Sequence, residues 1–319
     1  MTFYKQVRPI LMAIEKEIGS HLEARTPLAE EVSRYILKSG GKKLRPLLFV
    51  LSSHLCGCEN GEEIRLAPIF EYLHVATLLH DDVIDEAHLR RGKPTANNVW
   101  GNTIPILAGD FLLARALELA ASSGLLKMVQ LLAQTTSWLA QGEILEIVKT
   151  DALDLSEKEY FEIINGKTAV LIAASSRLGA VLAGAEEDKE NALQKYGHRL
   201  GLAFQIIDDV LDYIGSEKEF GKPVGHDIKE GKVTLPLIYA LKACTLEEKK
   251  QVKKQFERRK EEDIAAIVTL VKAKKGLELA TNKAIEFVKE AKEALSIFPP
   301  HPAKEILLQI ADFVIKRRY

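Results

Sequence analysis

The chain has 319 residues, with 44 lysines and arginines against 45 aspartates and glutamates, a formal net charge of −1, and 47% hydrophobic residues. Proteins that bind nucleic-acid backbones generally carry a basic surplus, so this balance argues against nucleic acid as a partner. The first residues lack the apolar core of a signal peptide, and no run of about 18 uncharged apolar residues is long enough to span a membrane. We therefore expect a cytoplasmic protein and, since no linker divides the chain, a single domain over residues 1–319.

Helical periodicity runs through nearly the whole chain. Apolar residues recur at intervals of three and four, which is typical of amphipathic helices. The ranges with this pattern are 3–18, 43–56, 66–84, 104–121, 125–148, 156–182, 190–214, 234–243, 260–272, 276–296 and 303–316. Capping boxes at Ser156-x-x-Glu159 and Thr245-x-x-Glu248 predict two helix starts. The sequence thus predicts an all-α bundle of about ten or more helices and no sheet, with Trp138 in its core.

Three segments interrupt the helices and are predicted to be loops: 39–43, 90–94 and 215–231. The segments 39–43 and 90–94 are basic, so they concentrate positive charge that the net balance hides. Cys56, Cys58 and Cys244 lack the further ligands of a zinc site and are interpreted as ordinary reduced thiols.

Two aspartate clusters carry most of the functional information. Asp81, Asp82 and Asp85 share one edge of an apolar helix, and a second set repeats the spacing at Asp208, Asp209 and Asp212. One such cluster is more often a solvated helix end, but both lead into a Gly-Lys-Pro segment, at 92–94 and at 221–223. Crowded carboxylates require a compensating cation, and oxygen-only ligands suit Mg²⁺. The sequence predicts two facing clusters that hold several Mg²⁺ ions and a bridging diphosphate.

The motifs around these clusters resemble those of the trans-polyprenyl diphosphate synthases, and most closely the octaprenyl type. The similar segments are, in chain order, 40–46, 71–85, 89–95, 167–169, 204–212 and 221–236. One departure is Lys43, where arginine is commoner in that family. The resemblance implies an isoprenoid-synthase-type helical bundle around a central cavity, and usually a homodimer.

The reaction that the resemblance implies is ionisation of an allylic diphosphate, such as farnesyl diphosphate, followed by attack of isopentenyl diphosphate and loss of a proton. Three Mg²⁺ ions, bound by Asp81, Asp85 and Asp208 with Asp82, Asp209 and Asp212 in support, would stabilise the pyrophosphate leaving group. The same resemblance assigns the allylic diphosphate to Arg90, Lys167, Thr168, Gln205, Lys222 and Lys232. It assigns isopentenyl diphosphate to a metal-free set, Lys42, Arg45, His74 and Arg91. The residues expected to be catalytic are Asp81, Asp82, Asp85, Lys167, Asp208, Asp209 and Lys232.

Several of these residues have ordinary structural alternatives when taken singly. Gly40-Gly41 is compatible with a helix C-cap, His74 with a hydrogen-bonded core histidine, Lys167 with a surface position and Asp227 with a loop anchor.

Product length is the finer question. Ala76 and Thr77 lie one helical turn before Asp81 on the same face, and small residues there would leave a tunnel open for the growing chain. This favours a product of thirty to fifty carbons, such as octaprenyl diphosphate for a quinone side chain, with Leu119 and Met128 as candidates for the tunnel floor. A farnesyl or geranylgeranyl diphosphate synthase remains the alternative.

Other functions fit parts of the sequence. His74, His80 and Asp81 are compatible with a metal phosphohydrolase, and Glu71-x-x-His74 with half of a di-iron site whose second half is missing. A class I terpene cyclase usually has a different second metal motif. A non-catalytic subunit of a two-component synthase typically lacks one or both aspartate clusters.

Overall fold

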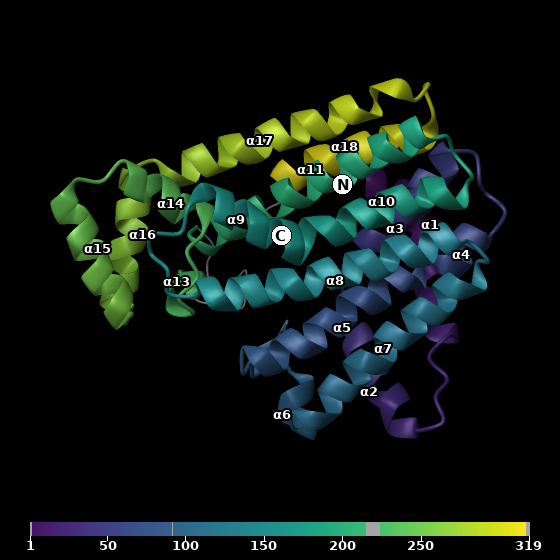
Figure 1. Ribbon diagram of the computed structural model, residues 1–319, viewed down its shortest axis with the longest axis horizontal. Coiled ribbons are helices and arrows are strands. Elements are labelled where there is room, and N and C mark those ends of the chain that lie inside the picture. Colours follow the sequence, from purple (N-terminus) through teal and green to yellow (C-terminus); the bar gives the residue numbers. More distant parts are fainter. Residues whose placement is uncertain (1, 91, 215–223, 317–319) are drawn as a thin grey trace. The chain divides into compact units, whose positions relative to one another are not determined.

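The structure is a computed structural model that describes residues 2–90, 92–214 and 224–316. Helices account for most of the described residues (Figure 1). They are α1 (Thr2–Ser20), α2 (Pro27–Leu37), α3 (Leu44–Leu55), α4 (Glu62–Leu66), α5 (Pro68–Ile84), α6 (Ala96–Trp100), α7 (Thr103–Ser122), α8 (Leu126–Lys149), α9 (Glu157–Ile164), α10 (Val170–Leu182), α11 (Glu187–Asp212), α13 (His226–Lys229), α14 (Leu235–Lys242), α15 (Leu246–Arg258), α16 (Glu261–Ala273), α17 (Gly276–Ala294) and α18 (Pro302–Lys316). Within these ranges, no helix is both long and apolar enough to cross a membrane.

The chain separates into two compact units, each built from three segments. The first unit comprises Met1–Thr136, Ala174–Gln194 and Ile297–Leu307, and the second comprises Ser137–Ala173, Lys195–Ser296 and Leu308–Tyr319. The first aspartate cluster belongs to the first unit and the second cluster to the second. A single domain over residues 1–319 stays a prediction.

In the first unit, α5 packs along α7 (Figure 1). α5 begins at Pro68, whose fixed φ and missing N–H are tolerated in the first turn of a helix. Near its other end, the ring of His80 lies against Gly109 of α7, where a Cβ atom would come within 2.3 Å of the His80 Nε2. The same nitrogen lies 3.1 Å from the Ile106 carbonyl oxygen. The missing side chain at Gly109 therefore lets the two helices approach closely beside the first aspartate cluster.

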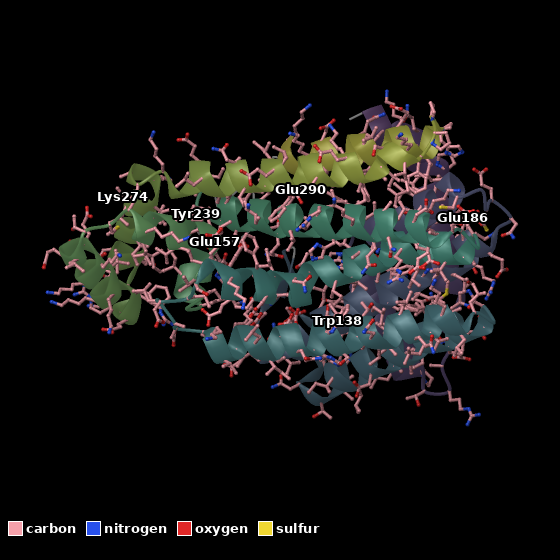
Figure 2. The ribbon with its side chains drawn as sticks, turned by 45° about the horizontal axis from the view of Figure 1, so that its top comes forward. Trp138, Glu157, Glu186, Tyr239, Lys274 and Glu290 are labelled. Atoms are coloured by element: carbon pink, nitrogen blue, oxygen red, sulfur yellow. The ribbon has the colours of Figure 1, made fainter. Side chains whose placement is uncertain are left out.

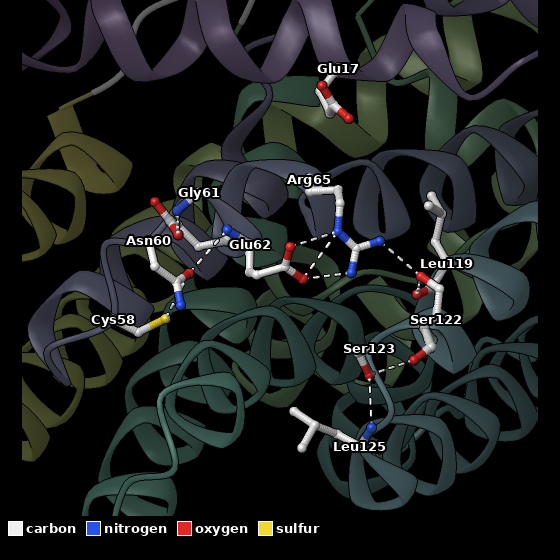
Figure 3. A network of polar contacts seen from close by, with 12 residues as sticks. Glu17, Cys58, Asn60, Gly61, Glu62, Arg65, Leu119, Ser122, Ser123 and Leu125 are labelled. Atoms are coloured by element: carbon white, nitrogen blue, oxygen red, sulfur yellow. Dashed lines mark hydrogen bonds and ion pairs between the residues drawn. The ribbon is translucent and has the colours of Figure 1, made fainter.

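The short helix α4 is joined to the end of α7 by a polar network (Figure 3). Arg65 donates to the Glu62 carboxylate through Nε and Nη2, and its Nη1 donates to the Ser122 hydroxyl at 2.9 Å. Asn60 and Glu63 cap the start of α4 by accepting from the backbone N–H groups of Glu62 and Gly61. This network therefore joins α4 to the C-terminal end of α7 within the first unit.

In the second unit, the predicted helix over 156–182 is interrupted by a π-helical turn, Asn165–Ala169, between α9 and α10. The backbone of this turn touches α8, because a Cβ on Gly142 would lie 2.6 Å from the carbonyl carbon of Gly166. On another side, a Cβ on Gly201 of α11 would lie 2.6 Å from the Cα of Ala169. π-turns are rare and often occur at functional sites. Here the turn carries Lys167 and Thr168.

The all-helical prediction and both capping boxes are confirmed, since Ser156 and Thr245 each accept from the N–H three residues later. The expectation of no sheet is wrong in one place: β1 (Leu89–Arg90) and β2 (Lys93–Pro94) form an antiparallel hairpin. The segment was too short to show any alternation in sequence. Helices α2, α4, α6 and α13 were also not predicted from periodicity, and only the start of α15 was predicted, from its capping box.

The predicted core position of Trp138 is wrong. Its side chain is 43% exposed on α8 (Figure 2). The buried face of this helix includes Leu139 and Gly142. Residue 138 is rotated about 100° from Leu139 around the helix axis and lies outside that face. Cys56, Cys58 and Cys244 are free thiols, as expected.

Replacing glycine by alanine is predicted to change stability in opposite directions at two positions of the first unit, one without room for a methyl group and one with it. A Cβ on Gly179 would lie 2.4 Å from the Phe49 carbonyl oxygen, whereas one on Gly19 has only Arg34 nearby, at 3.8 Å. Gly179→Ala should lower the free energy of unfolding by about 1 to 3 kcal/mol through overpacking. Gly19→Ala should leave it unchanged or raise it by up to about 1 kcal/mol through helix propensity. Urea denaturation measures both, and equal effects would contradict the packing of α10 on α3.

Candidate active site

The first aspartate cluster lies at the C-terminal end of α5, and its members differ in exposure. Asp82 is only 1% exposed, Asp81 is half-buried, and Asp85 is exposed and caps the helix end. Arg90 binds Asp82 Oδ1 through Nε at 2.8 Å and Nη2 at 2.7 Å. Asp82 Oδ2 is buried and has no hydrogen-bond partner within the part of the chain that the structure describes. The middle carboxylate is thus fixed by Arg90, while Asp81 and Asp85 are less buried.

The hairpin β1–β2 places Arg90 beside Asp82. Its register pairs Arg90 with Lys93, and Gly92 takes a left-handed φ of 74° at the turn. The Thr95 hydroxyl donates to the Ala87 carbonyl oxygen at 2.6 Å and holds the end of the hairpin against its start. Arg91, predicted to bind isopentenyl diphosphate, lies outside the described residues.

The glycine-lysine motif forms a loop that requires left-handed backbone. Gly40, Gly41 and Lys43 have φ values of 93°, 140° and 48°. Lys43 is buried and its Nζ lies 2.8 Å from Glu71 Oε1 on α5. The positive charge at residue 43 therefore forms an internal ion pair, with both side chains 7% exposed.

This pair ties the start of α3 to α5. Three predicted isopentenyl diphosphate ligands lie close in sequence to its two members. Lys42 is exposed next to Lys43, and Arg45 lies in the first turn of α3. His74 is half-buried on α5, three residues after Glu71 and so on the same helical face.

The second aspartate cluster repeats the arrangement on α11 with different partners. Asp209 is 5% exposed, and Tyr160 Oη donates to its Oδ2 at 2.5 Å. Gln205 Nε2 donates to Asp209 Oδ1 at 2.9 Å and, in turn, Gln205 Oε1 accepts from Thr168 Oγ1 at 2.7 Å. Asp208 and Asp212 are half-buried. The predicted residues Thr168 and Gln205 therefore do meet the second cluster, as a chain that orients Asp209.

Asp209 is the electrostatically costly member of this cluster. Burial, followed by the nearby Asp227 and Asp208 carboxylates, raises the pKa of Asp209 well above its ordinary value, although the hydrogen bonds from Tyr160 and Gln205 oppose this. Burial and the Asp209 charge also raise the pKa of Tyr160, so its hydroxyl remains a donor. A cation beside the cluster would relieve this cost.

Asp212 holds the next segment of the chain. Its two carboxylate oxygens accept from the backbone N–H groups of His226 (3.1 Å) and Asp227 (3.3 Å), and its carbonyl oxygen accepts from the Gly225 N–H. The Asp227 carbonyl oxygen in turn accepts from the Lys232 N–H at 2.8 Å. The backbone at Asp227 thus serves as the loop anchor that the sequence left open. Lys222 lies outside the described residues.

Lys167 and Lys232 meet around carboxylates that sequence reasoning missed. Lys167 Nζ lies 2.5 Å from Glu146 Oε2 and 3.2 Å from Glu143 Oε2 on α8. Lys232 Nζ lies 2.8 Å from Glu230 Oε2 and 3.8 Å from the same Glu146 Oε2. Burial acts to raise the pKa of Glu230, but His226 and Lys232 lower it well below its ordinary value. The i, i+3 spacing of the two glutamates on α8 was the available signal for Glu143 and Glu146.

The donors at both clusters fit a hard divalent cation. They are carboxylate oxygens without cysteine or histidine, which is the ligand type that Mg²⁺ prefers. The buried Asp82 Oδ2 lacks a hydrogen-bond donor among the described residues, as an oxygen that faces a cation would. In those residues, no group of three or more His, Cys, Asp or Glu side chains is close enough to hold an ion alone.

Comparison with known proteins identifies the family. The Polyprenyl synthetase family profile matches residues 26–273. The chain belongs to this family. This polyprenyl synthetase is similar to octaprenyl diphosphate synthase of Haemophilus influenzae, with 37% identity over 316 residues that cover 99% of this chain and 96% of the relative. It is also similar to geranylgeranyl diphosphate synthase of Sulfolobus acidocaldarius, with 35% identity covering 97% of each chain.

A solved structure agrees with this assignment. A polyprenyl synthase from Caulobacter crescentus, complexed with calcium and isoprenyl diphosphate, superposes with a TM-score of 0.94 at 37% identity, covering 99% of this chain and 97% of that one. The isoprenyl synthase fold and the enzyme class, a prenyltransferase, follow from these matches. The relatives differ in product length, so the family alone leaves that length open.

Replacing Asp82 or Asp209 by asparagine should change the free energy of unfolding of the metal-free protein in opposite directions. Asp209→Asn should raise the free energy of unfolding at neutral pH. The raised pKa of Asp209 means that its buried charge costs progressively more stability as the pH rises above the ordinary aspartate value, and asparagine removes that cost. Asp82→Asn should lower stability by about 1 to 3 kcal/mol, because Arg90 loses its charged partner.

Thermal unfolding in the presence of a chelator, from pH 5 to pH 8, measures both variants. Destabilisation by Asp209→Asn would contradict the unfavourable burial of the Asp209 charge.

Proposed function

We propose that this polyprenyl synthetase lengthens an allylic diphosphate, such as farnesyl diphosphate, by successive condensation with isopentenyl diphosphate in a Mg²⁺-dependent reaction. The observation that carries the proposal is the repeated cluster: a buried middle aspartate held by the protein, between two aspartates that are less buried. A lysine pair accompanies the second cluster. Carboxylates that hold cations, together with ammonium groups, form an environment for a diphosphate leaving group.

The allylic diphosphate is assigned to the aspartates and the lysine pair. Asp81, Asp85 and Asp208 would hold Mg²⁺, which supplies Lewis-acid stabilisation of the leaving pyrophosphate. Lys167 and Lys232 bind pyrophosphate oxygens and stabilise the negative charge that develops as the C1–O bond breaks. Asp82, Asp209 and Asp212 support the site through the contacts with Arg90, Tyr160 and the backbone at His226.

Isopentenyl diphosphate is assigned to cations alone, so that its own C–O bond is retained. Lys42 and Arg45 lie within two residues of Lys43 in sequence, and His74 lies three residues after Glu71 on α5. The double bond of isopentenyl diphosphate attacks the allylic C1, a new carbon–carbon bond forms, and the departing pyrophosphate accepts the proton that restores the double bond. The product is again an allylic diphosphate, which permits another cycle.

The structure weakens the phosphohydrolase alternative. His80 does not pair with Asp81 through Nε2, which faces the Ile106 carbonyl oxygen at 3.1 Å and Asp110 at 3.5 Å on α7. Both aspartate clusters are complete, which separates the chain from a non-catalytic subunit, and the second keeps the Asp-rich pattern that a terpene cyclase usually lacks.

A product of thirty to fifty carbons, such as octaprenyl diphosphate for a quinone side chain, is the favoured length. Ala76 is 4% exposed on α5, and the Thr77 hydroxyl donates to the His74 carbonyl oxygen at 2.8 Å. The α5 face before Asp81 therefore offers small groups with satisfied polar atoms, which suits an apolar chain. The similarity to the Haemophilus octaprenyl diphosphate synthase supports this length; the Sulfolobus relative keeps a geranylgeranyl product as the alternative.

We also propose a homodimer in the cytoplasm, with three Mg²⁺ ions at each active site. Large apolar side chains stay exposed along α8, at Trp138, Ile144, Ile147 and Val148. Exposed apolar side chains grouped on one helix are typical of a protein–protein contact.

Incubation of the purified protein with farnesyl diphosphate, labelled isopentenyl diphosphate and Mg²⁺ tests the reaction, with products separated by chain length. We expect a ladder that ends at one long product and disappears when Mg²⁺ is chelated. Release of phosphate or pyrophosphate without incorporation would indicate a hydrolase or a cyclase instead, and no reaction at all would point to a missing partner subunit.

Ala76→Tyr tests the product-length assignment. The phenol ring should block chain growth beside Asp81, so products should shorten to about fifteen to twenty carbons while the first condensation with a short allylic starter continues. Ala76→Ser is the control for substitution at a buried site and should keep the long product. An unchanged product distribution in the Ala76→Tyr variant would remove this position from the tunnel wall.

A further inference from the structure

Lys167 and Lys232 come from distant parts of the sequence, and one carboxylate joins them. Lys167 lies in the π-turn between α9 and α10, whereas Lys232 follows α13. Glu146 Oε2 is 2.5 Å from one ammonium nitrogen and 3.8 Å from the other. All three side chains are about four-fifths buried, with side-chain exposures of 23%, 20% and 19% for Lys167, Lys232 and Glu146.

The two lysines would repel each other without this carboxylate. Like charges that are partly removed from water interact strongly, and lysine side chains have four rotatable bonds with which to separate. Flanking carboxylates extend the alternation of charge, since Glu143 contacts Lys167 and Glu230 contacts Lys232. Glu146 contacts both lysines through the same oxygen, Oε2.

The backbone around Lys232 is held independently of Glu146. The Asp151 N–H donates to the Gly231 carbonyl oxygen at 2.9 Å, and Arg259 forms an ion pair with the Asp151 carboxylate. Gly231 has a φ of 79°, and a Cβ there would meet Asp151 Oδ1 at 2.2 Å. A change at Glu146 should therefore alter the lysine side chains and leave the loop that carries Lys232 in place.

We propose that Glu146 is a positioning residue that holds Lys167 and Lys232 as a single preformed clamp for the diphosphate of the allylic substrate. This inference deepens the proposed function and rests on it. When the diphosphate binds, its oxygens join Glu146 as partners of the two ammonium groups, so the lysines need not be brought together at that moment. Preorganisation of this kind increases affinity by reducing the ordering cost of binding.

Glu146→Gln tests the proposal because it removes the charge and keeps the side-chain length. The KM for farnesyl diphosphate and the Kd for Mg²⁺-pyrophosphate, measured by calorimetry, should each rise about tenfold, which corresponds to about 1.4 kcal/mol. The KM for isopentenyl diphosphate should not change, since its predicted ligands Lys42, Arg45 and His74 belong to the other unit. Glu146→Asp, which keeps the charge on a shorter side chain, should restore part of the affinity.

Glu162→Gln is the matched control, because it removes one partner of the exposed Lys158–Glu162 pair on α9 in the same unit. It should leave both substrates unaffected. Tighter binding of pyrophosphate by Glu146→Gln would show that Glu146 competes for the lysines, and unchanged binding would show that it does not position them. A parallel rise in both KM values would indicate a general loss of structure. Each of these results would overturn the proposal.

Measurements on the wild-type protein distinguish failure of the proposed function from failure of the Glu146 proposal. If it binds pyrophosphate but forms no prenyl product, the proposed function fails, and the pyrophosphate affinities still decide the role of Glu146. If it binds no pyrophosphate, both proposals fail.

Discussion

The burial of one carboxylate in each aspartate cluster is the constraint on which the rest of the site depends. Asp82 and Asp209 occupy the middle of their clusters, with exposures of 1% and 5%. A buried carboxylate needs partners, because an isolated one costs more free energy than a small domain can spare. Their partners lie on separate segments, Arg90 on a hairpin and Tyr160 on α9, so satisfying the carboxylate also fixes the neighbouring elements.

The two clusters meet this requirement differently. Asp82 has a full positive charge beside it, whereas Asp209 receives hydrogen bonds from the neutral side chains of Tyr160 and Gln205. Neutral donors leave the negative charge in place, and the pKa of Asp209 is raised accordingly. The second cluster therefore gains more from a bound cation than the first, and a Mg²⁺-diphosphate complex would supply one. The lysine pair near it, already neutralised by Glu146 and its neighbours, provides the complementary charge for the diphosphate.

Much of the helical fold could be predicted from the sequence, because apolar periodicity and capping boxes are local signals. The hairpin at 89–94, with strands of two residues each, has too few residues to show a pattern, and short α6 and α13 fail for the same reason. Trp138 was wrongly predicted to be buried because tryptophan is usually buried, whereas its position around the helix axis determines which face it occupies. The π-turn at 165–169 could not be foreseen, since it depends on close backbone contact with Gly142 and Gly201.

The site was predictable where several charged residues are adjacent in sequence. The aspartate spacing identified both clusters, and resemblance supplied Lys167 and Lys232. The contacts that hold the site residues in place were missed. Tyr160 contacts Asp209, Glu71 contacts Lys43 and Glu146 contacts Lys167, each from a different helix or turn. In sequence, each of the three looks like an ordinary core aromatic or a solvated acid. Which member of a cluster is buried is likewise decided by the face that α5 or α11 turns to its neighbours.

The proposed function requires that both aspartate clusters bind Mg²⁺ for the same diphosphate. Calorimetric titration of inorganic pyrophosphate with Mg²⁺ into wild-type protein, Asp81→Asn, Asp208→Asn and the double variant tests it most directly. The account predicts that either single substitution loses nearly as much affinity as the double one, because both clusters share the same ligand through its cations. Losses that simply add, or pyrophosphate binding that does not require Mg²⁺, would contradict it.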